Sequence, residues 1–137
     1  MRVLSLHQPW AFFVVSGIKR WETRSRPAGC FGPLLIHATL RVCPVGHEVY
    51  GRVADLLGLV SAPRFDELPR GAILGRVGFT ACASTELVRP NEINRMLGDF
   101  SAGRYAYLFR NAVEFEQPTP AKGHQGWWSF REENLRS

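Results

Sequence analysis

The sequence predicts an α+β fold in which a small mixed β-barrel carries short helices on its outside. Segments with strand patterns alternate with short segments of helical periodicity. The 13 glycines indicate many turns between these segments. A chain of 137 residues is long enough for one hydrophobic core and short for two. We therefore expect residues 1–137 to form a single domain.

Five segments have the apolar pattern of β-strands. Apolar residues surround Ser5 in the first of them, and the next follows a Gly-Pro turn. The third is long, and we expect a bend at Gly75 or Gly78, because a glycine inside a strand often indicates a bulge. The fourth fits a strand pair or one long bent strand, and a proline-bearing loop over residues 117–126 follows it. The expected strands are residues 2–6, 32–39, 71–85, 104–116 and 127–130.

Three segments have the periodicity of helices. Pro9 fits a first helical turn, and the apolar residues after it recur at helical spacing as far as Ile18, with Gly17 as the terminator. Residues 91–98 begin at an asparagine cap and end at a glycine. Residues 46–59 place four apolar side chains at helical spacing, namely Val49, Val53, Leu56 and Leu57.

The positive charge is concentrated in the first part of the chain. The formal net charge is +5, and residues 1–52 hold seven Lys/Arg against two Glu, whereas the remainder holds ten of each sign. A basic excess in one part of a sequence suits a polyanionic or phosphate-bearing partner, although it also favours solubility.

Residues 19–26, KRWETRSR, are too polar to continue the preceding apolar helix. Read as an extended segment, they place Arg20, Glu22 and Arg24 on one face. The other face receives Lys19, Trp21, Thr23 and Ser25. Because both faces carry polar groups, we expect one of them to line a cleft. The alternative is an ion-pair network that only stabilises the helix exit.

Several function classes lack support in the sequence. His7, Gln8 and Pro9 interrupt the first apolar run, so we expect neither a signal peptide nor membrane contact, and a cytoplasmic protein. The three cysteines have no CxxC spacing and the four histidines no paired spacing, so we expect no disulfide, no metal and no cofactor. Serine-elbow, P-loop and dinucleotide-binding motifs are also missing. Nothing in the sequence indicates an oligomer, and we assume a monomer.

The N-terminal stretch LSLHQPWAFFVVSGIKRWETRSRP resembles the signature of the ASCH domain family. The elements that carry the resemblance are the Gln8-Pro9-Trp10-Ala11 block, Gly17-Ile18-Lys19, and Glu22 with Arg24 two residues later. The later segments GPLLIHAT, GAILGRVGF and GRYAYLFRN extend the match over nearly the whole chain. The first block is the specific part.

This resemblance implies a PUA-like β-barrel with a cleft beside the first helix, and RNA, a nucleotide or a nucleoside as the ligand. Lys19 is then a point charge for phosphate, or a base or nucleophile if burial lowers its pKa. Arg24 offers a planar fork to a phosphate or a base edge, and Glu22 accepts from an exocyclic amine or holds Lys19 and Arg24 in place.

Further ligand contacts are expected around these three residues. One tryptophan is expected to stack on a base, with Trp10 or Trp128 the preferred platform. The resemblance places the loop with Lys122 and Gln125 near the cleft, and His37 is either a hydrogen-bonded strand residue or a cleft group. The complete set of expected ligand-binding residues is Gln8, Trp10, Lys19, Glu22, Arg24, Ser25, His37, Lys122, Gln125 and Trp128.

Other functions compete with binding. One ASCH-like branch removes the acetyl group of N4-acetylcytidine and uses a lysine, a threonine three positions later and a distant glutamate. In this sequence Lys19 matches the lysine. Glu22 occupies the position of the threonine, and Thr23 follows it. If the protein is an enzyme, Lys19 and Glu22 are the expected catalytic residues. A ribonuclease would use Lys19 as stabiliser and His37 as general base. A protein-interaction domain ranks last, because it predicts an exposed apolar patch.

Overall fold

The computed structural model describes residues 1–136, and its main feature is one mixed sheet of six strands. The strands are β1 (Arg2–Leu6), β2 (Trp21–Arg24), β3 (Gly32–Ala38), β4 (Ala72–Ser84), β5 (Tyr105–Pro120) and β6 (Trp127–Ser129). The α-helices are α1 (Trp10–Val15), α2 (Gly46–Leu57) and α3 (Glu92–Met96). Short 3-10 helices span Phe65–Glu67, Thr85–Leu87 and Glu132–Asn134.

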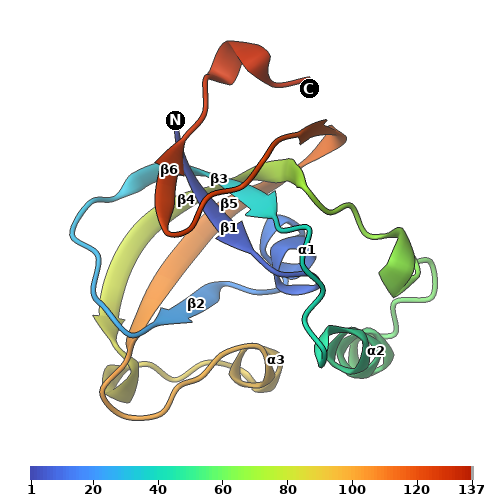
Figure 1. The fold of residues 1–137 in the computed structure, drawn as a ribbon. Helices are drawn as coiled ribbons and strands as arrows, with labels where there is room; N and C mark the ends of the chain where they lie inside the picture. The colour runs from blue at the N-terminus through green and yellow to red at the C-terminus, as the bar shows by residue number, and fades with distance from the viewer. Residues whose placement is uncertain (137) are drawn as a thin grey trace.

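The strand order is β2-β5-β4-β3-β1-β6, and the sheet curves into a half-barrel. β1 and β3 are parallel neighbours, whereas the other neighbouring pairs are antiparallel. Figure 1 shows α2 and α3 at the end of the molecule opposite both termini. The fold class is therefore the α+β arrangement of a mixed sheet and short outer helices that the sequence predicts.

The expected bend in the long strand β4 is present. The pairing register between β4 and β5 shifts between Ile73 and Gly75 and again between Arg76 and Gly78. At Gly75 a Cβ atom would lie 2.2 Å from the carbonyl oxygen of Val113, so the two strands approach too closely for a side chain there. Glycine thus permits the curvature of the sheet.

Two apolar layers surround α1. Its side chains Ala11, Val14 and Val15 pack against the concave sheet, and Phe13 packs on the opposite side against Tyr50 and Val53 of α2. Leu56 and Leu57, which share the helical spacing of Val49 and Val53, are 57% and 41% exposed, whereas Val53 is buried.

Strand β5 is longer than the sequence suggests. It runs as one bent strand to Pro120, so the loop expected over residues 117–126 is confined to residues 121–126. Proline is tolerated there because Pro120 pairs with Ala72 at the very end of the ladder. None of the helices within residues 1–136 combines the length and the apolar character that crossing a membrane requires.

Candidate functional site

An ion-pair relay connects the interior of the protein to its surface at the start of β2. Glu22 Oε1 lies 3.3 Å from Lys19 Nζ, and Glu22 Oε2 accepts a hydrogen bond of 2.8 Å from Arg24 Nε. The side chains of Lys19, Glu22 and Arg24 are 0%, 11% and 36% exposed. The Glu22 carboxylate therefore has a positive charge on its buried side, from Lys19, and another on its exposed side, from Arg24.

Lys19 is buried rather than directed at a ligand. Its ammonium group donates to the carbonyl oxygen of Trp21 as well as pairing with Glu22, and burial lowers the pKa of Lys19. The expected separation of Lys19 and Glu22 onto opposite faces was wrong. The strand begins only at Trp21, and the Lys19 N–H still bonds to the carbonyl oxygen of Phe13 in α1.

A cleft lies beside this relay, at the C-terminal ends of the parallel strands β1 and β3. One part of it, here called the inner cavity, has a volume of about 570 Å³ and is lined by Trp10, Glu22, Thr23, Arg24 and Asp99 among others. The outer cavity measures about 910 Å³ and is lined by His37, Arg41, Lys122, His124 and Gln125 among others. Ser5, His7, Arg24 and Thr39 line both.

Consecutive side chains of β2 reach the inner cavity. Thr23 was expected on the face opposite Glu22 and Arg24, yet all three line this cavity. β2 is the edge strand of the sheet, so the cavity follows its free edge and meets side chains from both faces. The Thr23 hydroxyl accepts a hydrogen bond of 2.9 Å from the backbone N–H of Asp99.

The two cavities differ in charge. Two carboxylates, Glu22 and Asp99, and one cation, Arg24, line the inner cavity. Hydrogen bonds from the Ser101 hydroxyl and N–H lower the pKa of Asp99. In the described part of the chain, the outer cavity has Arg24, Arg41 and Lys122 in its lining and no carboxylate. The basic character expected for the whole cleft thus belongs to its outer part.

Four expected ligand residues lie outside the lining of both cavities, namely Gln8, Lys19, Ser25 and Trp128. The Gln8 amide is buried, where Nε2 donates to the carbonyl oxygen of Pro69 at 2.7 Å and Oε1 accepts from the N–H of Phe12 at 3.0 Å. These bonds join α1 to the loop before β4, so the structure gives the Gln8 amide no contact with the cleft. Ser25 is exposed just beyond β2 and lines neither cavity.

The two preferred stacking residues have different surroundings. Trp10 is half-buried and lines the inner cavity. Trp128 lines neither cavity; its indole N–H donates to Ser5 Oγ at 3.0 Å, and its ring contacts His37 and His124 edge-on. Trp10 is therefore the better placed platform.

His37 is a buried, hydrogen-bonded residue on β3. Its Nδ1 lies 3.0 Å from Ser5 Oγ and its Nε2 lies 2.8 Å from the carbonyl oxygen of Ala121. Burial lowers the pKa of His37, and the nearby His124 acts in the same direction. Because Ser5 Oγ and the Ala121 carbonyl oxygen lie between the two ring nitrogens and any ligand, this geometry gives no support to His37 as the base that takes a proton directly from an RNA hydroxyl.

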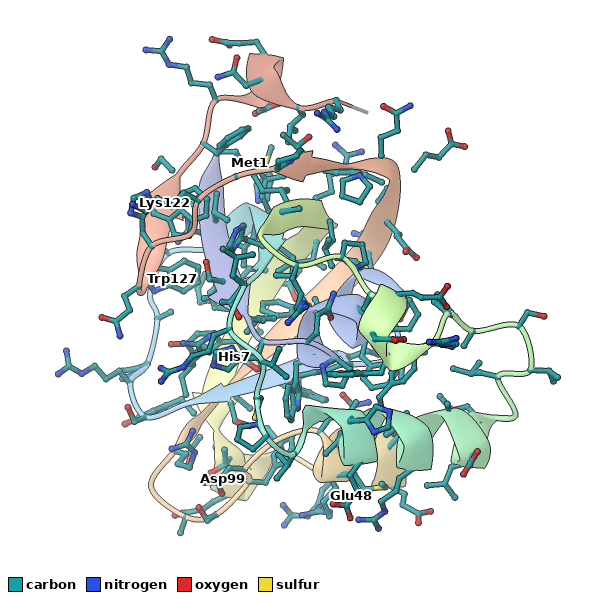
Figure 2. The ribbon with its side chains drawn as sticks, turned by 45° about the vertical axis from the view of Figure 1, so that its right-hand side comes forward. Met1, His7, Glu48, Asp99, Lys122 and Trp127 are labelled. Atoms are coloured by element: carbon teal, nitrogen blue, oxygen red, sulfur yellow. The ribbon has the colours of Figure 1, made fainter. Side chains whose placement is uncertain are left out.

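The sequence did not single out His7, Thr39 or Asp99 as cleft residues. His7 Nδ1 lies 2.7 Å from Thr39 Oγ1, and His7 stands where the two cavities meet. Figure 2 shows His7 between Lys122 on one side and Asp99 on the other. The position of His7 directly before Gln8-Pro9-Trp10 could have indicated a cleft residue. No local pattern indicates Asp99, because 76 residues separate it from its partner Thr23. No group of three His, Cys, Asp or Glu side chains within residues 1–136 is arranged to hold a metal ion.

Comparison with known proteins gives a consistent result. Residues 4–119 match the ASCH domain. The chain is 32% identical over 129 residues to Activating signal cointegrator 1 of Homo sapiens and 30% identical over 128 residues to that of Mus musculus. These alignments cover 93% of this chain but 22% of each relative, so the chain spans about a fifth of their length.

The fold also matches solved structures. The crystal structure of ASCH from Zymomonas mobilis aligns with a TM-score of 0.54 at 16% identity, covering 97% of this chain and 89% of that one. A point mutant of the same Zymomonas mobilis protein aligns with a TM-score of 0.55. This likeness shows the fold alone, which agrees with the predicted PUA-like α+β barrel. On the family match and the identity to these relatives, the chain belongs to the ASCH domain family.

Proposed function

We propose that this domain binds single-stranded RNA, with the base of one nucleotide in the inner cavity and the neighbouring phosphates in the outer cavity. The observation that carries the proposal is the separation of charge along the cleft. Arg24, Arg41 and Lys122 line the outer cavity and suit phosphate oxygens. Glu22 and Asp99 line the inner cavity, where a base presents donor groups to them.

The size and surroundings of the inner cavity support a single base and its ribose. Its volume of about 570 Å³ is within the usual range for small-ligand pockets, roughly 300 to 1,000 Å³. Trp10 provides a planar apolar surface in its wall, and stacking of a base on such a ring contributes about 1 to 3 kcal/mol. Sequence-specific recognition of RNA generally uses unstacked bases in this way.

The carboxylates predict which bases bind. Ionised carboxylates only accept hydrogen bonds. Cytosine and adenine present exocyclic amines, whereas uracil presents a carbonyl oxygen at the corresponding position. We therefore expect the inner cavity to prefer cytosine or adenine over uracil, with Glu22 as the main contact.

Fluorescence anisotropy of labelled oligo(C), oligo(A) and oligo(U) RNA at two salt concentrations tests this function. An Arg41→Gln/Lys122→Gln double variant should lose about tenfold in affinity and about two units of salt slope, because two phosphate contacts disappear. Arg52→Gln is the matched control, since Arg52 is exposed on α2 and lines neither cavity. Equal losses in the control and the double variant would contradict a specific outer site.

Glu22→Gln tests base recognition separately. The substitution keeps the shape of the side chain but exchanges an acceptor for a donor, so the preference for oligo(C) over oligo(U) should fall by several-fold while the salt slope stays unchanged. An unaltered preference would remove Glu22 from base recognition. The same measurement with DNA oligonucleotides tests whether ribose hydroxyls contribute.

Amide hydrolysis of an N4-acetylcytidine-type nucleoside is the second candidate, and the placement of Thr23 favours it. Thr23 lines the inner cavity beside Glu22, and burial lowers the pKa of the nearby Lys19. Chromatography of N4-acetylcytidine incubated with the protein should then reveal cytidine, and Thr23→Val should abolish its release. If the wild type releases none, this candidate is excluded and the binding proposal is unaffected.

A further inference from the structure

Ser5 and His37 form a polar pair in the floor of the cleft. They are register partners on the parallel strands β1 and β3, and Ser5 Oγ lies 3.0 Å from His37 Nδ1. Both side chains line the outer cavity, and Ser5 also lines the inner one. The pair therefore borders the space in which a ligand would lie.

The surrounding groups fix the direction of every hydrogen bond in this pair. The carbonyl oxygen of Ala121, 2.8 Å from His37 Nε2, can only accept, so Nε2 carries the proton and the neutral ring leaves its lone pair on Nδ1. The indole N–H of Trp128, 3.0 Å from Ser5 Oγ, can only donate. Ser5 consequently donates its proton to His37 and accepts from Trp128.

This is the arrangement that activates a serine nucleophile. A base lies within hydrogen-bond distance of the hydroxyl, and a third group orients the base in the required tautomer. The Trp128 N–H donates to Ser5 Oγ and so holds the hydroxyl with its proton directed at His37 Nδ1. A hydroxyl oxygen has two lone pairs, and Trp128 uses one, so the second is free for attack.

The loop over residues 121–126 restricts what can reach Ser5. Gly123 lies directly on the pair, since a Cβ atom at this position would be 2.8 Å from His37 Nδ1 and 3.2 Å from Ser5 Oγ. Gly123 therefore narrows the space beside Ser5 on this side, which favours small acyl groups. A small acyl group can approach from the side on which Ser5 borders the two cavities.

We propose that Ser5 is a nucleophile and His37 its general base in a site that transfers small acyl groups from esters to water, independently of RNA binding. Ser5 Oγ forms a bond to the ester carbonyl carbon while its proton passes to His37 Nδ1. The bond to the leaving alkoxide then breaks, and Nδ1 returns the proton to that group. Water attacks the acyl-serine with Nδ1 again as the base, which releases the acid and restores Ser5. Ala121 and Trp128 act as positioning residues.

Reaction of the wild-type protein with p-nitrophenyl acetate tests the proposal. We expect a burst of p-nitrophenolate approaching one equivalent, and peptide mass spectrometry should locate the acetyl group on Ser5. Ser5→Ala and His37→Gln should each remove the burst. Ser61→Ala and His47→Gln are matched controls that should retain it, because both residues are exposed and line neither cavity.

The location of the acetyl group in the wild type decides the question even if a variant fails to fold. Acetylation found at the N-terminus or Lys122 but not at Ser5 would overturn the proposal, as would a full burst in a folded Ser5→Ala protein. Trp128→Phe provides a second test, since it retains the Ser5 and His37 pair but removes the N–H donor. This variant should slow acetylation of Ser5 by about tenfold or more, and an unchanged rate would exclude a positioning role of Trp128.

Discussion

The side-chain oxygen of Asn94 accepts hydrogen bonds from two consecutive backbone N–H groups, those of Arg20 at 2.8 Å and Trp21 at 3.2 Å. Asn94 also donates through Nδ2 to the carbonyl oxygen of Ile18 at 3.1 Å. One buried side chain of α3 thereby fixes the connection between α1 and β2. This connection carries Lys19 and begins the strand that carries Glu22.

Asn94→Ala should destabilise the protein and disorganise the cleft together. The substitution leaves buried N–H groups without an acceptor, and each such group costs about 1 to 3 kcal/mol. We expect a loss of about 2 to 4 kcal/mol in the free energy of unfolding, measured by urea titration. Asn134→Ala, at an exposed position, is the control and should have little effect. Equal stability of the two variants would show that the Asn94 contacts contribute nothing.

The Lys19 and Glu22 pair should behave as a coupled unit in a double-mutant cycle. Lys19→Met retains the apolar stem but removes the buried charge opposite Glu22, which then keeps only Arg24. We expect a coupling energy of about 1 to 2 kcal/mol between Lys19→Met and Glu22→Gln in urea unfolding. The exposed pair of Arg64 and Asp66 provides the control cycle and should show no measurable coupling. Additive effects at Lys19 and Glu22 would contradict the relay.

Two glycine substitutions should change the stability of the protein in opposite directions. In Gly123→Ala the new methyl group would lie 2.4 Å from His37 Cε1, and the buried ring cannot move aside, so the loop must shift. We expect a destabilisation of about 1 to 3 kcal/mol. Gly51→Ala, in α2 with no atom within 4 Å of the added carbon, should stabilise by about 0.5 to 1 kcal/mol through helix propensity. Thermal denaturation of both variants checks this pair, and a destabilised Gly51→Ala protein would contradict it.

Local sequence patterns predicted the helices and strands well, because residues that are close together in the sequence largely determine where these elements form. Apolar periodicity and glycine positions located α1, α2, α3 and five of the six strands, and the polar character of residues 19–26 indicated the remaining strand. Errors occurred where tertiary contacts decide. Leu56 and Leu57 have helical spacing yet are exposed, and Pro120 ends a strand because β4 provides its partner.

The site was predictable only in part for the same reason. Glu22, Arg24 and Trp10 lie within one short N-terminal stretch and do border the cleft. Asn94 and Asp99, which hold β2 in place, are more than 70 residues away along the chain and have no local signature. The burial of Lys19 also depends on this tertiary packing. The sequence shows the charge of Lys19 but not its burial, and we predicted a ligand contact from the charge.

His37 should make stability depend on pH between neutral and mildly acidic conditions. Burial lowers the pKa of His37 in the folded protein below the value of about 6.5 that histidine has in an unfolded chain. Above this value both states are neutral and the stability is fully present. As the pH falls below it, the unfolded state binds a proton that the folded state does not, so the free energy of unfolding decreases until the folded pKa is passed.

Urea unfolding at about pH 7.5 and about pH 5.5, on either side of the unfolded-state pKa, checks this dependence. The wild type should lose more stability between these two conditions than His37→Gln does, whereas His47→Gln, at an exposed position, should follow the wild type. The carboxyls of Asp66 and Asp99 have lowered pKa values and titrate below this window, so they contribute little to the difference. The same loss in the wild type and in His37→Gln would show that His37 is not the group responsible.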